Sequence, residues 1–176
     1  EGRRLRQRDG VTCGPSVAIV GAALLDPDYA GALTDADWFA DEQGRLHRGL
    51  NRLWPRALGT TPRGIRRALS RHSAVPYRWR AARPRHDRLL DVREAVLLGH
   101  PVAMLVGNWL PRHWVLLIDV VGTSGFRCYE PSSGAICTVD TVDIRAGRLR
   151  GVGFARAWAF VLPVSPFRSA TSTRRG

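Results

Sequence analysis

A cysteine near the beginning of the chain lies in a sequence context that suits nucleophilic chemistry. Cys13 is followed by an apolar segment of small residues at 14–25, "GPSVAIVGAALL", which is typical of a buried helix. Unpaired N–H groups and the helix dipole favour an anion at a helix N-terminus, so we expect the pKa of the Cys13 thiol to be lowered. The alternative is that Cys13 is an inert packing residue, because free cysteines are among the most buried residues.

A glutamine six residues before Cys13 could support this chemistry. A cysteine that attacks a carbonyl carbon needs hydrogen-bond donors aimed at the developing oxyanion. The backbone N–H of Cys13 is one candidate, and the side-chain amide of Gln7 is the second. The alternative is that Gln7 is a solvated loop residue.

One of the five histidines is placed to act as a general base. His113 begins the apolar segment "HWVLLIDVVG" at 113–122, directly after the turn "NWLPR", so its side chain could face a cleft while the strand behind it is packed. A hydrogen-bonded histidine at a strand end is the alternative. Trp109 and Trp114 flank His113 and are candidates for the walls of the cleft. The other histidines lie in surface, cap or turn segments: His47, His72, His86 and His100.

A third group should orient the imidazole of His113. Asp119 is unsuitable, because it lies six residues along the same strand, roughly 20 Å away at about 3.3 Å per residue. The midpoint between His113 and Glu130 falls at the predicted turn near Gly122, so a small bulge or a diagonal contact would bring Glu130 to the imidazole. The alternative is that Glu130 is a solvent-facing carboxylate before the turn "PSSG".

The surrounding elements are helices in the first hundred residues and strands thereafter. The predicted helices are 14–25, 34–43, 60–72 and 86–101. Thr34 or Asp35 is expected to cap the second, and Thr61 the third. The residues expected to face inward are Ile65, Ala68 and Leu69 in the third helix, and Leu89, Leu90, Val92, Val96 and Leu97 in the fourth. The predicted strands are 101–107, 113–122, 126–131, 135–142 and 155–164. Short turns join these strands, so we expect an α+β fold with helices packed on an antiparallel sheet.

Composition limits the classes of protein that the chain can represent. It has 176 residues and a net charge of +12, and all 27 basic residues are arginine. Because the arginines are scattered, we expect no dedicated nucleic-acid binding, although acidic partners are favoured. No apolar run of about 18 residues is present, so no membrane span is predicted.

The length predicts one domain at 1–164 and a flexible C-terminal tail at 165–176. The chain begins at Glu1, which we interpret as a processed or truncated product, so that a cytoplasmic and a secreted bacterial location both stay open. Cys128 and Cys137 fall opposite each other across the turn "PSSG"; they could form a disulfide or stay reduced, and we favour the reduced form. They lack partners at metal-ligand spacing, so no metal or cofactor is expected.

Four motifs in order resemble those of the papain-like cysteine peptidases, most closely the bacterial leader-peptidase branch that processes bacteriocins. These are Gln-x5-Cys-Gly-Pro, "LLGHPVAMLV", "HWVLLIDVVG" and "YEPSSG", although the segment 26–95 carries no matching motif. The resemblance implies a papain-like fold with Cys13 as nucleophile, His113 as base and acid, and Gln7 as oxyanion donor. Glu130 stands where the family has Asp or Asn, a departure that adds a methylene group.

We therefore predict a thiol hydrolase that cleaves a peptide or amide bond through an acyl-enzyme, acting on a peptide or protein substrate. The same triad could instead transfer the acyl group to an amine, as a transglutaminase does, or deamidate glutamine in a target protein. A non-catalytic papain-like module that binds a peptide is the third reading. The presence of both Cys13 and His113 argues against that module.

Overall fold

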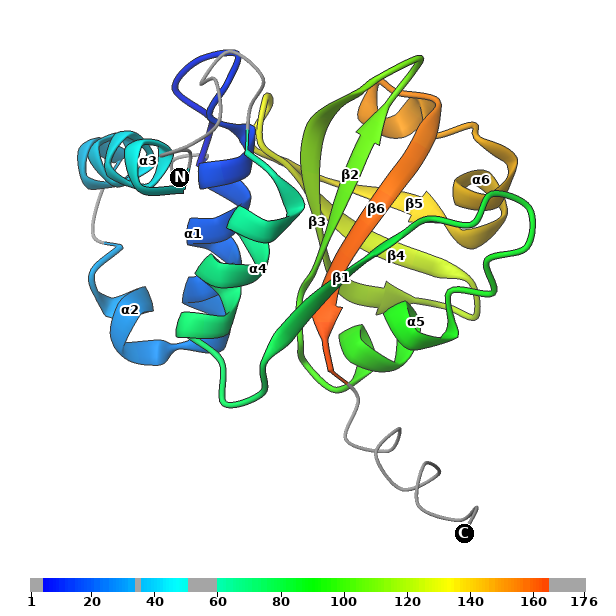
Figure 1. The fold of residues 1–176 in the computed structure, drawn as a ribbon, viewed down its shortest axis with the longest axis horizontal. Helices are drawn as coiled ribbons and strands as arrows, with labels where there is room; N and C mark the ends of the chain where they lie inside the picture. Colours follow the sequence, from blue (N-terminus) through cyan, green and yellow to red (C-terminus); the bar gives the residue numbers. More distant parts are fainter. Residues whose placement is uncertain (1–4, 34–35, 51–59, 165–176) are drawn as a thin grey trace, which may run out of the picture.

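An antiparallel sheet with helices on both of its faces forms the centre of the structure (Figure 1). The computed structural model describes residues 5–33, 36–50 and 60–164. The strands are β1 (Tyr77–Ala81), β2 (Val102–Gly107), β3 (Pro111–Val121), β4 (Gly125–Glu130), β5 (Ala135–Asp140) and β6 (Arg156–Pro163), in the order β1-β6-β2-β3-β4-β5. Every neighbouring pair is antiparallel, which confirms the predicted α+β class.

Two of the N-terminal helices, α1 (Cys13–Leu25) and α4 (Pro62–Arg71), pack against one face of the sheet (Figure 1). The other two, α2 (Pro27–Gly31) and α3 (Ala36–Leu50), pack on α1 farther from the sheet. Val17 of α1 and Leu69 of α4 pack with Trp114 of β3 in one apolar cluster. Gly21 allows this close approach, because a Cβ atom there would lie 2.6 Å from Leu69 Cδ2.

The opposite face is covered by α5 (Leu90–Leu97), α6 (Thr141–Ala146) and the short 3-10 helix η2 (Arg150–Val152). Successive side chains of a strand point to opposite faces of the sheet. Trp114 and Leu116 of β3 therefore join the core beneath α1, whereas Val115 and Leu117 join the core beneath α5 and α6. Burial on both faces explains why this strand is a continuous apolar run rather than an alternating one.

The structure extends the sequence prediction at several places. The predicted helix 34–43 is observed as α3, which continues to Leu50. Its proposed caps, Thr34 and Asp35, lie outside the described residues. The predicted tail 165–176 also lies outside them. Helices α2 and α6 and strand β1 were not predicted. Within the described ranges, no helix is both long and apolar enough to cross a membrane.

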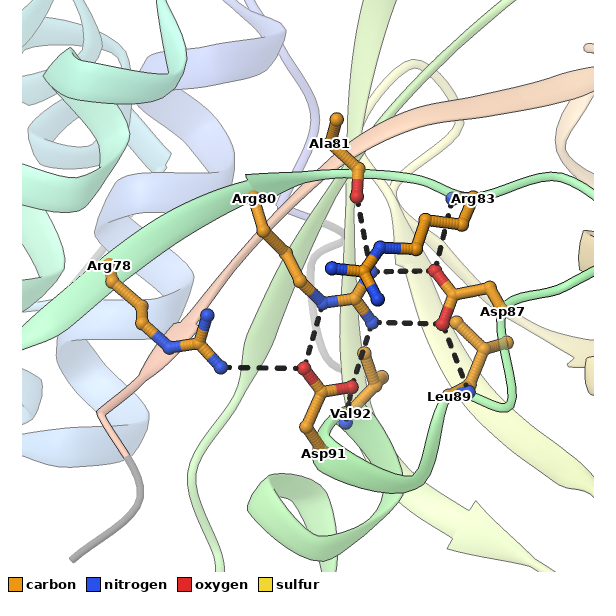
Figure 2. A network of polar contacts seen from close by, with 8 residues as sticks. All are labelled: Arg78, Arg80, Ala81, Arg83, Asp87, Leu89, Asp91 and Val92. Atoms are coloured by element: carbon orange, nitrogen blue, oxygen red, sulfur yellow. Dashed lines mark hydrogen bonds and ion pairs between the residues drawn. The ribbon is translucent and has the colours of Figure 1, made fainter. Parts of the chain in front are cut away.

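Strand β1 escaped prediction because its short sequence, YRWRA, carries two arginines, one of which is largely buried. Figure 2 shows the guanidinium of Arg80 between the carboxylates of Asp87 and Asp91. The distances are 2.6 Å and 3.1 Å to the oxygens of Asp87, and 2.7 Å from both Nε and Nη2 to the oxygens of Asp91. Arg80 also lies over the ring of Phe160, with Cζ 4.8 Å from the centroid. These contacts compensate the burial of the charge and tie the edge strand to the loop before α5 and to the first turn of α5.

The inward face predicted for the helix at 86–101, which is observed as α5, is partly wrong. Leu89, Val92 and Val96 are buried, but Leu90 and Leu97 are each 63% exposed. Helix α5 has only eight residues, and its buried stripe is formed by Val92, Ala95 and Val96. Leu90 and Leu97 are seven residues apart, and therefore share the face that points away from that stripe.

A pair of substitutions tests this orientation. We expect Val92→Ala to lower the free energy of unfolding by about 1–3 kcal/mol, because this side chain of α5 is fully buried. The matched control Leu97→Ala should change it by less than about 0.5 kcal/mol. Urea denaturation followed by circular dichroism measures both values, and equal losses would show that the assigned face of α5 is incorrect.

Candidate active site

The first turn of α1 places a buried thiol beside three backbone N–H groups. Cys13 is 2% exposed, and its thiol interacts with the N–H groups of Cys13, Gly14 and Trp114. Burial raises the pKa of this thiol, and the three N–H groups lower it only in part, while the charge of Glu130 raises it further. The pKa of Cys13 is therefore raised overall, and the lowering expected from the sequence is wrong. Desolvation of the thiol outweighs the effect of the helix N-terminus, so Cys13 is a neutral thiol at pH 7.

The imidazole of His113 and the carboxylate of Glu130 meet at one end of the sheet. Nε2 of His113 lies 2.8 Å from Oε1 of Glu130. The register pairs Leu116 with Tyr129, which puts Glu130 opposite Val115 and two positions from the residue facing His113. Diagonal neighbours of this kind lie on one face of a sheet within reach of long side chains. Glu130 is the last residue of β4, and its extra methylene helps to span the diagonal.

The turn after β4 holds the Glu130 carboxylate in its charged form. The Ser132 N–H donates to Oε1 over 2.8 Å, while the Ser133 N–H and hydroxyl donate to Oε2 over 2.8 Å and 2.7 Å. Burial raises the pKa of Glu130, but these hydrogen bonds and the one from His113 outweigh it and bring the pKa to about 2. The turn "PSSG" therefore has a function beyond reversing the chain, which its sequence alone did not reveal.

The charge on Glu130 determines where the proton of neutral His113 resides. A carboxylate can only accept hydrogen bonds, so Nε2 carries the proton and Nδ1 keeps its lone pair. Burial lowers the pKa of His113, and the hydrogen bond and charge of Glu130 restore it only in part. Phe154 stacks on the imidazole with 5.2 Å between ring centroids. The result is a neutral imidazole of fixed orientation with an unprotonated nitrogen.

Two observations place the thiol near this pair. The N–H that reaches the Cys13 thiol from β3 belongs to Trp114, the residue directly after His113. The Glu130 carboxylate that bonds the imidazole is also close enough to raise the pKa of Cys13. Cys13, His113 and Glu130 therefore lie at the same end of the sheet, where α1 begins and β4 ends.

The N-terminal segment runs across this end of the molecule, beside the turn between β4 and β5 (Figure 1). The backbone N–H of Gln7 donates to the carbonyl of Pro131 over 2.7 Å, and the Tyr129 hydroxyl donates to the carbonyl of Leu5 over 2.7 Å. The side-chain oxygen of Gln7 is buried and has no hydrogen-bond partner among the described residues. Gln7 thus lies next to the strand end that carries Glu130, with an amide that is not saturated by neighbouring groups.

A second glutamine, not predicted from the sequence, holds this segment from the helical side. Gln43 of α3 is fully buried; its Oε1 accepts the Arg8 N–H over 2.8 Å, and its Nε2 donates to the Arg6 carbonyl over 3.0 Å. These bonds fix the backbone on both sides of Gln7. A lone glutamine in a polar helix gives no sign of this in sequence, because the partners are backbone groups more than 30 residues away.

The remaining candidates lie outside this cluster or beside it. Asp119 is exposed, and its Oδ2 lies 4.0 Å from Nε of Arg127. This agrees with its exclusion as the group that orients His113. Trp114 is buried, with its indole N–H donating to the Thr60 carbonyl over 2.8 Å, whereas Trp109 is 86% exposed. His47 and His72 were expected at the surface, yet both are half-buried, and His72 bonds Asp26 over 2.8 Å.

Cys128 and Cys137 face each other across β4 and β5, as predicted, and both thiols are free. The hydrogen bond from Cys128 lowers the pKa of Cys137. The same contact raises the pKa of Cys128, which is buried. Cys137 is only half-buried and has the lowered pKa of the two, so labelling experiments on Cys13 must account for it.

Comparison with solved structures identifies the fold. The peptidase domain of Streptococcus ComA, a bifunctional ABC transporter involved in a quorum-sensing pathway, is similar with a TM-score of 0.50 and 16% identity, over 93% of this chain and 100% of that domain. The Streptococcus mutans ComA peptidase domain gives a TM-score of 0.47 with 15% identity, over 92% of this chain and 100% of that one. No protein-family model and no curated protein matches the chain. The first likeness confirms the papain-like fold that the sequence motifs predicted.

The pKa of Glu130 predicts how pH affects stability. Because its pKa falls from 4.5 to about 2 on folding, the carboxylate stabilises the fold fully above about pH 4.5 and ceases to do so as pH falls toward 2. We expect Glu130→Gln to lower the free energy of unfolding by about 1–3 kcal/mol at pH 7 and by progressively less between pH 4.5 and 2. Urea denaturation across this range measures the difference.

The matched control is Glu94→Gln, which removes an exposed carboxylate from α5. This variant should follow the unsubstituted protein at every pH. A Glu130→Gln deficit that stays constant from pH 7 to pH 2 would contradict the role assigned to the charge.

Proposed function

We propose that the chain is a thiol hydrolase that cleaves a peptide or amide bond through an acyl-enzyme on Cys13. The observation that supports it most is the 2.8 Å contact between His113 Nε2 and a Glu130 carboxylate that stays charged, which leaves Nδ1 as a base at the end of the sheet where Cys13 lies. The fold of a known peptidase domain supports a peptide as substrate, by analogy alone.

In the proposed first step the sulfur of Cys13 attacks the substrate carbonyl carbon. The thiol and the imidazole are both neutral at rest, so Nδ1 of His113 takes the thiol proton as the C–S bond forms. The carbonyl oxygen becomes an oxyanion, and the backbone N–H of Cys13 and the side-chain amide of Gln7 donate to it. Glu130 stabilises the imidazolium without taking its proton, because its pKa of about 2 is far too low.

The second step releases the amine and the third regenerates the thiol. His113 gives its proton to the leaving nitrogen, the C–N bond breaks, and a thioester remains on Cys13. His113 then takes a proton from water, whose oxygen attacks the thioester carbon. The C–S bond breaks and the thiolate recovers its proton from His113.

Single substitutions test this assignment. In a Cys128→Ala/Cys137→Ala background, where Cys13 is the one thiol left, we expect iodoacetamide to add one label at pH 7. His113→Ala should slow the labelling by roughly 100-fold or more, the scale of lost general-base catalysis, and Cys13→Ala should abolish it. Glu130→Ala should slow it less than either, because orienting the base is a smaller effect. Intact mass spectrometry measures all four rates.

The control variant His86→Ala removes an exposed histidine and should label at the unsubstituted rate. Equal rates for His113→Ala and His86→Ala would reject the proposed base. New chain termini in a peptide mixture treated with the protein would support cleavage, whereas ammonia release from intact chains would replace hydrolysis of the backbone with glutamine deamidation.

A further inference from the structure

The side of the imidazole that faces away from α1 is where a leaving group would lie. Under the proposed function, His113 protonates the departing nitrogen, so the substrate residues after the scissile bond pass over the imidazole rather than over α1. Phe154 stacks on His113 and packs against the core opposite α1. Groups around Phe154 are therefore placed to contact the part of the substrate that departs.

A hollow of about 440 Å³ lies directly beside Phe154. Its walls include Phe154, Arg148, Arg150 and Asn108. Asn108 fixes the tip of the β2–β3 hairpin to this region, because its side-chain oxygen accepts the Ala155 N–H over 2.9 Å. A volume of this size accommodates an amino-acid side chain. We call this hollow the Phe154 hollow.

The Phe154 hollow carries net positive charge. Arg150 makes no ion pair with any residue in the described parts of the chain, and Arg148 makes a loose one, 3.5 Å from Asp143, with both side chains largely exposed. Arg156 is not part of the wall but lies beside Gly147, which is, and it makes no ion pair within the described ranges. Glu130 lines a separate hollow with Phe154, and its carboxylate is already bound by His113 and the serines of its turn.

We infer that the Phe154 hollow binds a carboxylate of the substrate on the leaving-group side of the scissile bond. The inference rests on the proposed function and adds the chemistry of the substrate to it. Guanidinium groups bind carboxylates through charge-assisted hydrogen bonds, and an unpaired Arg150 with a loosely paired Arg148 beside an apolar ring suits an acidic side chain with an aliphatic stem. A free C-terminal carboxylate offers the same chemistry.

Acyl transfer tests this site without a known substrate. The p-nitrophenyl ester of N-acetylglycine acylates Cys13: a C–S bond forms, the ester C–O bond breaks and p-nitrophenolate leaves. An added amine that occupies the leaving-group side then attacks the thioester. The C–N bond forms, the C–S bond breaks, and His113 carries the amine proton to the sulfur. The ratio of amide product to N-acetylglycine reports how well each amine occupies that side.

Three acceptors separate a side-chain carboxylate from a terminal one: the α-amide of glutamic acid, called glutamic acid amide below, the α-amide of glutamine, and free glutamine. At low salt we expect glutamic acid amide to give roughly two- to tenfold more amide product than glutamine amide, the range for one or two exposed ion pairs. A preference for free glutamine instead assigns the hollow to a terminal carboxylate. Arg150→Gln should abolish the preference, and the charge-matched control Arg66→Gln on α4 should retain it.

Mass spectrometry of products and of the intact protein separates the possible failures. Equal yields from all three acceptors on an acylated Cys13 would overturn the assignment of the hollow and leave the proposed hydrolase intact. Loss of the preference in Arg66→Gln as well as in Arg150→Gln would also overturn it, because general surface charge would then be the cause. No acylation of Cys13 at all would overturn both proposals.

Discussion

The hydrogen bond between His113 and Glu130 is the interaction on which the candidate site depends. It joins β3 to the last residue of β4, and it requires a carboxylate that remains charged although it is largely buried. The backbone and hydroxyl of the following serines supply that charge compensation. With the charge in place, the proton of the neutral imidazole is directed to Nε2, and only the other ring nitrogen is free to act on a thiol.

The two halves of the site come from different layers, and the N-terminal segment connects them. Cys13 belongs to a helix packed on one face of the sheet, whereas His113 stacks on Phe154 at the other face. The segment around Gln7 binds Pro131 on the strand side and Gln43 on the helix side. Because both anchors use backbone groups, the position of Gln7 is set by the fold and depends little on its own side chain.

Much of this arrangement could be predicted from the sequence, and the failures have physical causes. The α+β class followed from the change of apolar period near Pro101, and the proximity of His113 and Glu130 followed from counting residues across a turn. Strand β1 was missed because the partners that neutralise Arg80 lie later in the chain, Asp87 in a loop and Asp91 in α5. The pKa of Cys13 was expected to fall, since the sequence shows a helix terminus but not the depth of burial. Gln43 and Ser133 were missed because their partners are set by tertiary structure.

Nitrogen NMR of the His113 imidazole reports directly whether Glu130 holds the proton on Nε2. We expect a neutral ring at pH 7 with the proton on Nε2, and a pKa below the ordinary value of about 6.5. In Glu130→Gln the pKa of His113 should fall further, because the hydrogen bond and charge that raise it are lost. A ring protonated on Nδ1, or a pKa above 6.5 that does not respond to Glu130→Gln, would show that Glu130 does not set the state of the imidazole.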